Sequence, residues 1–334
     1  MFNFAKKDFN VVQKFPMLIL ISVMIILCGA IFMLGQGLNL GIDYEGGAKV
    51  EIELADEIAD KDAFESHLRD FMNDNGYTVV DKMMESPLSE GGITYEFRLA
   101  YEFNRSTVAQ DAQDAFINKL NGDFKSNLTE AVETYLTGLG AQDLFEEDGV
   151  NVAVIGESSS KSLLNRTFIA IALALVAILV YIMIRFTVSS GLAAICGLTH
   201  DVLVMVALTA IFQIPVNMTF IAAVITIIGY SINASIVIFD KVRECQKSAA
   251  FAYASDEEIA NYAIKHSMVK ILLSILTTLI MVVALVLFSV STIQEFILPI
   301  IFGLLAGTFS ALCLSPSIWV LFRKLGAKMK SKKA

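Results

Sequence analysis

Long uninterrupted apolar runs are the dominant pattern along this chain. A hydrocarbon layer of about 30 Å needs roughly 20 apolar residues at helical rise, so each run of that length predicts a membrane-spanning helix. Six runs predict six spanning helices, at 16–36, 164–184, 189–212, 216–239, 268–290 and 296–322. The first run follows a basic segment but is too long for a signal peptide, and no small-residue cleavage site follows it. We therefore expect it to remain as an anchor.

The Lys and Arg residues beside these runs predict the orientation of the chain, because basic flanks are retained in the cytoplasm. The connections at 213–215 and 291–295 carry neither residue type. We therefore expect residues 1–15 and 323–334 to be cytoplasmic and residues 37–160 to be extracytoplasmic. The basic groups all fall on one predicted side: Lys6, Lys7, Lys14, Arg185, Lys241, Arg243, Lys247, Lys265 and Arg323 to Lys333.

Between the first two runs, the period of the apolar positions switches between strand and helix. Period-two alternation predicts strands, whereas a spacing of three and four predicts helices. The resulting order, β-α-β-β-α-β, is typical of a ferredoxin-like α+β domain. The fold predicted for the whole chain is therefore an α-helical membrane protein with this domain at 37–160 and a five-helix bundle at 161–322. The predicted strands are 48–55, 77–84, 92–100 and 150–156, with a turn at Ser86-Pro87 to Gly92, and the helices are 57–75 and 106–136, the latter interrupted near Asn121-Gly122.

Composition and charge agree with a membrane protein and exclude several classes. Hydrophobic residues make up 55% of the chain, charged residues 18%, and the mean hydropathy is +0.63. The net charge of −9 argues against a nucleic-acid partner, since no positive surface is available to displace counterions from phosphate. The charge is segregated: residues 37–160 hold 26 Asp and Glu against 8 Lys and Arg. The four cysteines lie far apart and predict neither a metal site nor disulfides.

A carboxylate stands in the middle of the third apolar run. Asp201, preceded by His200, lies in GLTHDVLVMVAL (197–208). A charged group at mid-depth in lipid costs several kcal/mol, so an intramembrane acid is a functional hypothesis by default. The alternative is a structural role as a partner for hydroxyl groups on adjacent helices.

Smaller polar residues recur in the next two runs. In the fourth run, Thr226, Tyr230 and Asn233, with Ser231 and Ser235 alongside, predict one polar stripe on one helix face. Such residues often only hold helices together. Three neighbouring spans with polar groups at similar depth nevertheless favour a hydrated core or an ion path. The fifth run adds Ser274, Thr277, Thr278 and a snorkelling Lys270, and Asp240, Lys241, Arg243 and Glu244 predict an interfacial salt-bridge cluster.

Three segments carry a resemblance to a known family: LGIDYEGGAKVEI (40–52), GLTHDVLVMVAL (197–208) and GYSINASIVIFDKVRE (229–244). Over almost its whole length the chain resembles the SecF subunits of the SecD/SecF family, relatives of the resistance-nodulation-division (RND) transporters. The resemblance implies a bacterial plasma-membrane protein that assembles with SecD, the SecYEG channel and a secreted polypeptide. It implies no cofactor, with the proton gradient as energy source and sodium as an open alternative.

The family motifs assign candidate residues and also show departures. The motif positions matched here are Gly41, Asp43, Gly46, Gly47, His200, Asp240 and Arg243. Where the family reads Ser-hydrophobic-Asn-Asp, this chain reads Ser231-Ile232-Asn233-Ala234, so the expected carboxylate is missing. Where the family reads Arg-Thr followed by Thr-Ser, it reads Lys270-Ile271 and Ser274-Ile275. The proton pathway is therefore assigned to Asp201, Lys270, Asn233 and Ser231.

Three functions remain open on the sequence. The first is a SecF-like subunit that converts proton flow into movement of the outer domain on an emerging polypeptide. The second is a scaffold of the same complex whose coupling has decayed with the missing carboxylate. The third is a small RND-type exporter, which we disfavour because an outer block of this size leaves little room for a drug-sized cavity. A conventional enzyme is least favoured, because no activated nucleophile or metal set is present in the sequence.

Overall fold

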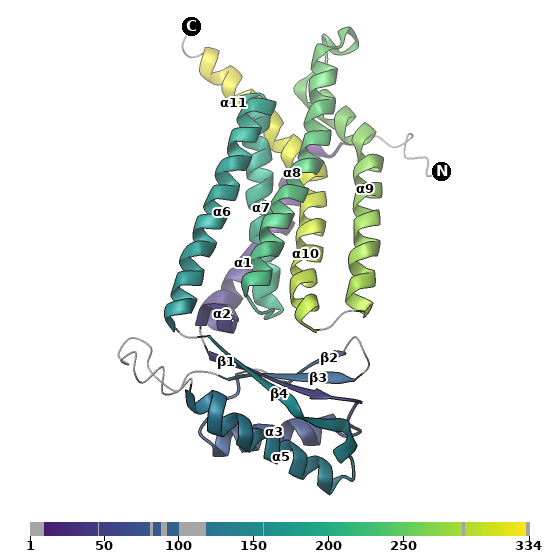
Figure 1. The fold of residues 1–334 in the computed structure, drawn as a ribbon. Coiled ribbons are helices and arrows are strands. Elements are labelled where there is room, and N and C mark those ends of the chain that lie inside the picture. Colours follow the sequence, from purple (N-terminus) through teal and green to yellow (C-terminus); the bar gives the residue numbers. More distant parts are fainter. Residues whose placement is uncertain are drawn as a thin grey trace. The chain divides into compact units, whose positions relative to one another are not determined.

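The structure is a computed structural model, and it describes residues 10–45, 47–80, 83–87, 92–99, 118–155, 157–288 and 291–331. The chain divides into two compact units. The first comprises Met1–Asn39, Ile169–Leu287 and Glu295–Ala334, and the second comprises Leu40–Phe168 with Phe288–Gln294. Figure 1 labels the elements of each unit.

The described residues contain six helices that are long and apolar enough to cross a membrane, which agrees with the six predicted spans. The sixth is built from three consecutive pieces, with a π-helical turn, η6, in its middle. The polar segments that follow the fourth apolar run and precede the fifth are also helical. α8 therefore ends after the fourth run, and α9 begins before the fifth. The elements are α1 (Phe15–Gly35), α6 (Glu157–Arg185), α7 (Val188–Ile211), α8 (Met218–Lys247), α9 (Asp256–Phe288), α10 (Ser291–Phe309), η6 (Ser310–Leu314) and α11 (Ser315–Ser331).

α7 is the central helix of the first unit and packs against α1, α8 and α11. Small residues allow the closest of these approaches, as is common between membrane helices. A Cβ placed on Gly29 of α1 would lie 2.4 Å from the Cβ of Ala207 in α7. The sequence of α7 thus supplies both small contact residues and, at Asp201, a buried carboxylate.

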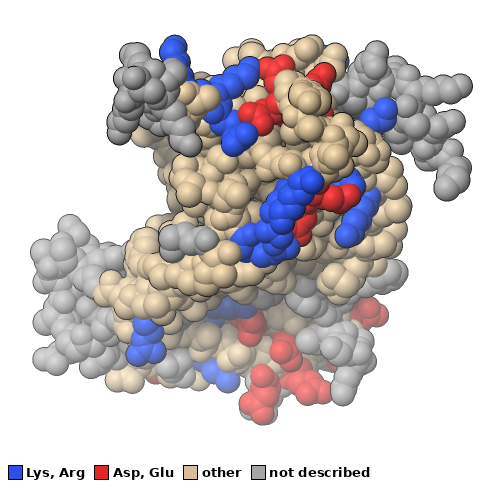
Figure 2. All heavy atoms as spheres, turned by 90° about the horizontal axis from the view of Figure 1, so that it is seen from above, with Lys and Arg blue, Asp and Glu red and all other residues tan. Residues whose placement is uncertain are grey.

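Charged residues gather at one end of the first unit. On the face shown in Figure 2, Lys and Arg side chains lie beside Asp and Glu side chains. Arg185 of α6 pairs with Asp240 of α8 at 2.7 Å, and the guanidinium of Arg243 donates to the carbonyl of Arg185 at 3.4 Å. Lys241 pairs with Glu244 at 2.8 Å. The cluster predicted from the sequence therefore contains one ion pair between α6 and α8, one ion pair within α8 and a hydrogen bond from Arg243.

The second unit contains a four-stranded antiparallel sheet in the order β2-β3-β1-β4. β1 pairs with both β3 and β4, and Figure 1 shows α3 and α5 on the same face of the sheet. Alternate residues of β1, such as Val50 and Ile52, point into the core with Phe64 and Leu68 of α3 and Leu128 of α5. The elements are β1 (Gly47–Leu54), α3 (Lys61–Asp74), β2 (Met84–Pro87), β3 (Ile93–Leu99), α5 (Lys125–Gly138) and β4 (Phe145–Ile155).

The strand predicted at 77–84 is wrong in position. β2 begins only at Met84, and before it Val79 forms an isolated bridge with Leu99. Tyr77 and Val79 are buried in the core, so their alternation reflects the packing of an extended connection. Ser86 and Pro87, predicted in a turn, belong to β2. Residues 81–82 and 88–91 lie outside the described part of the chain.

Other boundaries of the α+β unit shift for local reasons. α3 begins at Lys61 rather than 57, because the carboxylate of Asp60 caps it by accepting from the amide of Ala63 at 3.0 Å. β4 begins at Phe145 rather than 150. The helix predicted from 106 lies outside the described residues as far as 117, and its predicted interruption falls in a π-helical turn, η3 (Leu120–Phe124).

Candidate functional site

Asp201 is fully buried in the middle of α7. Its Oδ2 accepts hydrogen bonds from the hydroxyl of Ser231 in α8 and from the hydroxyl of Ser310 in η6, the latter at 2.8 Å. Its Oδ1 lies 2.9 Å from Nδ1 of His200. Hydrogen bonds to a charged acceptor are stronger than neutral ones. One carboxylate therefore joins three membrane helices through its own protonation-sensitive contacts.

The π-helical turn places Ser310 beside this carboxylate. A π-turn changes the helical phase by one residue and is frequent at functional sites. Gly307, one turn earlier, packs against the cluster, where a Cβ would be in ordinary van der Waals contact, 3.4 Å from the Cβ of Ser231 and 3.5 Å from Oδ2 of Asp201. The carbonyl oxygen of Gly307, 3.2 Å from the same hydroxyl, is an alternative acceptor for its single hydrogen. The sixth span thus contributes a hydroxyl group that lies between two acceptors, the carboxylate of Asp201 and a carbonyl of its own backbone.

Two buried polar atoms next to the cluster have no hydrogen-bond partner among the described residues: Nε2 of His200 and Oγ of Ser315. Ser315 stands beside Gly197, where an added Cβ would come within 2.3 Å of the serine oxygen. A buried polar atom without a partner costs about 1–3 kcal/mol. Ordered water at these atoms would remove that cost and extend the polar cluster.

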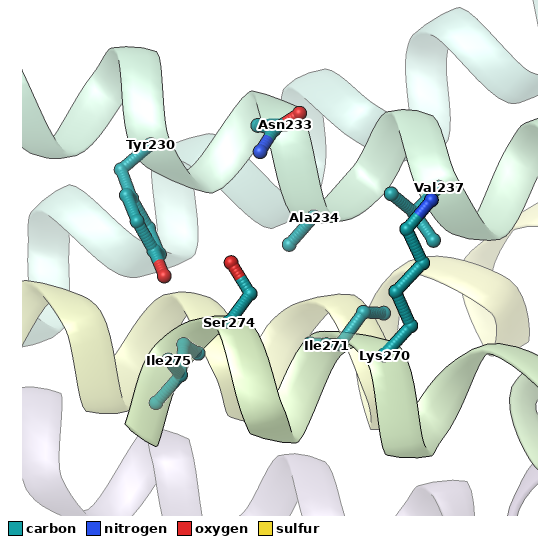
Figure 3. Close-up of a pocket in the computed structure, with 8 residues that line it drawn as sticks. All are labelled: Tyr230, Asn233, Ala234, Val237, Lys270, Ile271, Ser274 and Ile275. Carbon is teal, nitrogen blue, oxygen red and sulfur yellow. The ribbon is translucent and has the colours of Figure 1, made fainter. Parts of the chain in front are cut away.

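Asn233 and Lys270, also assigned to the proton pathway, belong to a different place. They line a cavity of about 130 Å³ between α8 and α9 (Figure 3). Within the described residues, the hydrogen-bond partners of Asp201 are His200, Ser231 and Ser310. The structure therefore brings Ser231 to Asp201 and does not bring Asn233 or Lys270 into contact with it.

The single polar stripe predicted on α8 is two separate faces. Ser231 and Ser235 are buried, whereas Thr226 and Asn233 are exposed. Residues two apart on a helix differ by about 200° around its axis, so Ser231 and Asn233 cannot face the same neighbour. On the second face, the hydroxyl of Tyr230 lies 3.3 Å from that of Thr278 in α9.

The glycine motif before β1 lies in the second unit. Gly47 has φ +141°, a backbone conformation that favours glycine, and the carbonyl of Gly41 accepts from the amide of Tyr44 at 3.0 Å. Asp43 lies in the short helix α2 (Ile42–Glu45), and Gly46 lies outside the described residues. Tyr44 is buried, which raises the pKa of its phenol, and its hydroxyl lies 3.3 Å from Oγ1 of Thr167. The motif therefore sets the backbone conformation of the segment that leads into β1.

Ser310 is the contact residue that the sequence interpretation missed. The signal was present, because Ser310, Ser315 and Ser317 interrupt the sixth apolar run within eight residues, SALCLSPS. Hydroxyl groups in a spanning segment can hydrogen-bond to polar groups on neighbouring helices, so these serines could have been considered as partners in the same way as the hydroxyl groups of the fourth and fifth runs. The π-turn that directs Ser310 toward Asp201 leaves no such mark in the hydrophobic pattern.

Comparisons with known proteins agree with the sequence resemblance. Residues 128–325 match the family model "Protein export membrane protein SecD/SecF, C-terminal", and residues 31–57 match the "SecD/SecF GG Motif". The protein translocase subunit SecF of Helicobacter pylori is 29% identical over 311 residues, covering 91% of this chain and 84% of that protein. The protein translocase subunit SecDF of Bacillus subtilis is 31% identical over 325 residues, covering 96% of this chain but 38% of that protein.

The fold is also similar to a solved structure. The crystal structure of SecDF from Thermus thermophilus, described as a translocon-associated membrane protein, has a TM-score of 0.71 at 22% identity, over 97% of this chain and 40% of that one. This chain therefore spans less than half of the SecDF proteins that it matches. Because the C-terminal family model covers more than half of its residues, the chain belongs to the SecD/SecF family of protein export membrane proteins.

Proposed function

We propose that this chain is a SecF-type subunit of a Sec accessory complex, which works with SecD at the SecYEG channel and uses the proton-motive force to promote the movement of secreted polypeptides. The names of its relatives, protein translocase subunits SecF and SecDF, support the role. In this proposal residues 37–160 form an extracytoplasmic ferredoxin-like domain and both termini are cytoplasmic. The strand order of the sheet and the basic helix ends support these placements.

The observation that carries the coupling proposal is the burial of Asp201 between hydroxyl groups from α8 and the sixth span. A protonated carboxyl group donates where a carboxylate only accepts. A proton taken up on Oδ2 would therefore make Ser231 or Ser310 turn its hydroxyl to accept instead of donate, and would weaken the charge-assisted link between these helices. If Asp201 takes up a proton from the outer side and releases it to the inner side, this change occurs once for each proton that crosses.

The energy scale is adequate for such a switch. Moving one charge through a potential of 100 mV provides about 2.3 kcal/mol. Two conformations separated by a few kcal/mol are shifted appreciably by a difference of that size. A few protons per cycle would thus suffice to move a domain between two states.

The test is Asp201→Asn, which keeps the shape of the side chain and removes its ability to ionise. Export of a secreted protein into inverted membrane vesicles is measured with and without an ionophore that collapses the proton gradient. We expect the variant to lose the gradient-dependent part of export and to keep the rest. Asp256→Asn, at a surface ion pair with Arg323, serves as the matched control and should behave as the wild type. Undiminished gradient dependence in Asp201→Asn would refute the assignment.

One observation favours a second candidate, a scaffold without coupling. Ala234 lines the cavity beside Lys270 at the position where the family resemblance implies an aspartate, and no lining residue is acidic. If coupling has decayed in this chain, Ala234→Asp leaves export unchanged. If the chain is coupled, the added carboxylate raises gradient-dependent export.

A further inference from the structure

The cavity between α8 and α9 has an unusual set of polar groups. Apart from Tyr230, whose hydroxyl lies 3.3 Å from that of Thr278, three of its lining side chains carry hydrogen-bond donors: Lys270, Asn233 and Ser274. None of the three side chains has a hydrogen-bond or ion-pair partner among the described residues. The remaining lining is Tyr230, Ala234, Val237, Ile271 and Ile275.

Figure 3 shows how these groups are arranged. The ammonium group of Lys270 extends from α9 to a position beside Val237 of α8. The hydroxyl of Ser274, one turn further along α9, points toward the gap between Tyr230 and Ala234, and Asn233 stands above Ala234. The donors thus surround one space from two helices, and the methyl group of Ala234 is directed toward it.

Lys270, Asn233 and Ser274 are exposed side chains, and their donors favour a negatively charged ligand at this place. Lys270 belongs to a candidate spanning segment, where an unpaired ammonium costs several kcal/mol. The lining residues include no Asp or Glu, and Asn233 and Ser274 add donors rather than a countercharge. The ligand chemistry that matches a cation with neutral donors is anionic, as in other sites built from Lys and polar side chains.

The size of the cavity limits that anion. Its volume is about 130 Å³, whereas pockets for drug-sized ligands range from about 300 to 1,000 Å³. A water molecule takes about 30 Å³ in the liquid, so the cavity has room for a monatomic anion with a few waters.

We propose that this cavity binds a small inorganic anion of the chloride class, held by the ammonium of Lys270 with the Asn233 amide and the Ser274 hydroxyl as further donors. The anion is the countercharge of Lys270 and ties α9 to α8. Much of α9 beyond Ile275 is exposed in this unit, so the bound anion contributes to the attachment of that helix.

The experiment uses the full chain, purified in mild detergent. Its thermal unfolding is followed in sodium chloride, sodium bromide and sodium gluconate at equal ionic strength, with the chloride concentration then titrated in gluconate. We expect the unfolding temperature to rise with chloride or bromide in a saturable way and not with gluconate. Anything that binds only the folded state raises stability in this manner.

Four variants assign the effect to the cavity. Lys270→Met abolishes the chloride dependence, and Asn233→Ala shifts the half-saturating concentration at least tenfold upward. Ala234→Asp places a fixed carboxylate beside the donors, so it removes the chloride dependence and stabilises the protein in gluconate. Ser274→Ala weakens binding without abolishing it. Two controls keep the wild-type response: Lys247→Met, an exposed cation at the end of α8, and Ala222→Asp, the same chemical change elsewhere on α8.

Three results obtained with this chain alone would overturn the proposal. They are equal stability in chloride and gluconate, an unchanged chloride response in Lys270→Met, and an unchanged response in Ala234→Asp. Stabilisation by a second membrane chain alone, with no response to chloride, would show that a partner's carboxylate occupies the cavity and would also overturn it. The measurement needs neither a proton gradient nor a channel, so its failure leaves the proposed function standing. Asp201→Asn, conversely, should keep the full chloride response.

Discussion

Ser310 and Ser231 donate hydrogen bonds to the same oxygen, Oδ2 of Asp201. The two serines come from different helices, and all three side chains are buried. Neither serine can move without changing the hydrogen bonding of a fully buried carboxylate. The cluster is therefore a point at which the positions of α7, α8 and the sixth span depend on one another.

Removing either hydroxyl should be costly and should reveal this dependence. We expect Ser310→Ala and Ser231→Ala each to lower the free energy of unfolding by about 1–3 kcal/mol, because each leaves a buried charged acceptor short of a donor. Denaturation in detergent measures the change. Ser317→Ala is the matched control, since Ser317 is buried on the same helix but donates only to the carbonyl of Cys313. The double variant should deviate from additivity, because both serines share one oxygen. Single losses no larger than that of Ser317→Ala would contradict the prediction.

The contact between α1 and α7 gives a second prediction. An added Cβ at Gly29 would lie 2.4 Å from the Cβ and 2.9 Å from the carbonyl oxygen of Ala207, so the helices must separate. Gly29→Ala should therefore destabilise the chain by about 1–3 kcal/mol, the usual range for overpacking. Gly35→Ala, on the same helix with open space around it, should be neutral or stabilising. Thermal unfolding in detergent compares the two, and Ala207→Gly should rescue Gly29→Ala only in part, because the added Cβ would still lie 2.5 Å from the Cα of residue 207. A stable Gly29→Ala variant would show that α1 does not approach α7 this closely.

The hydrophobic pattern predicted the membrane helices well because the requirement behind it is local. Each span must satisfy its own backbone and present apolar side chains to lipid, so length and composition suffice. The burial of Asp201 and its contact with Ser231 follow from the same reasoning, since a mid-span acid needs a partner on a neighbouring helix. These features depend on one segment, or on one segment and its nearest neighbour.

What the sequence did not predict depends on helix phase and on tertiary packing. Asn233 could have been separated from Ser231 by counting, because two residues correspond to about 200° on a helix. Ser310 could not be directed toward Asp201 in that way, since the π-turn shifts the phase after Phe309. The displaced strand at 77–84 fails for another reason: Tyr77 and Val79 alternate as in a strand but fill the core beside it. Alternation reports which side chains are buried, and pairing partners decide which segments become strands.

Glu51 of β1 and Glu96 of β3 stand directly opposite each other in the sheet, with Lys49 between them. The ammonium of Lys49 lies 2.9 Å from Glu51 and 2.8 Å from Glu96, and Nε of Arg98 lies 3.6 Å from Glu96. Like charges opposite each other destabilise a sheet, so Lys49 offsets a repulsion. Burial lowers the pKa of Lys49, but the hydrogen bonds and charges of Glu96 and Glu51 outweigh it, and the pKa lies above its ordinary value of 10.5.

The direction of this shift predicts how stability depends on pH. A lysine whose pKa is higher in the folded than in the unfolded chain contributes stability that is fully present below the unfolded value and is lost as the pH rises through the folded one. We therefore expect the sheet to lose stability above about pH 10.5, the ordinary lysine value. In Lys49→Met that alkaline loss should be smaller, while stability at pH 8 should already be reduced because the two carboxylates lose the cation between them. Lys125→Met, at a lysine with no ion pair among the described residues, should lose as much as the wild type. Chemical unfolding of the full chain at pH 8 and pH 11, followed by near-ultraviolet circular dichroism, makes the comparison, and an equal alkaline loss in wild type and Lys49→Met would show that Lys49 does not carry this linkage.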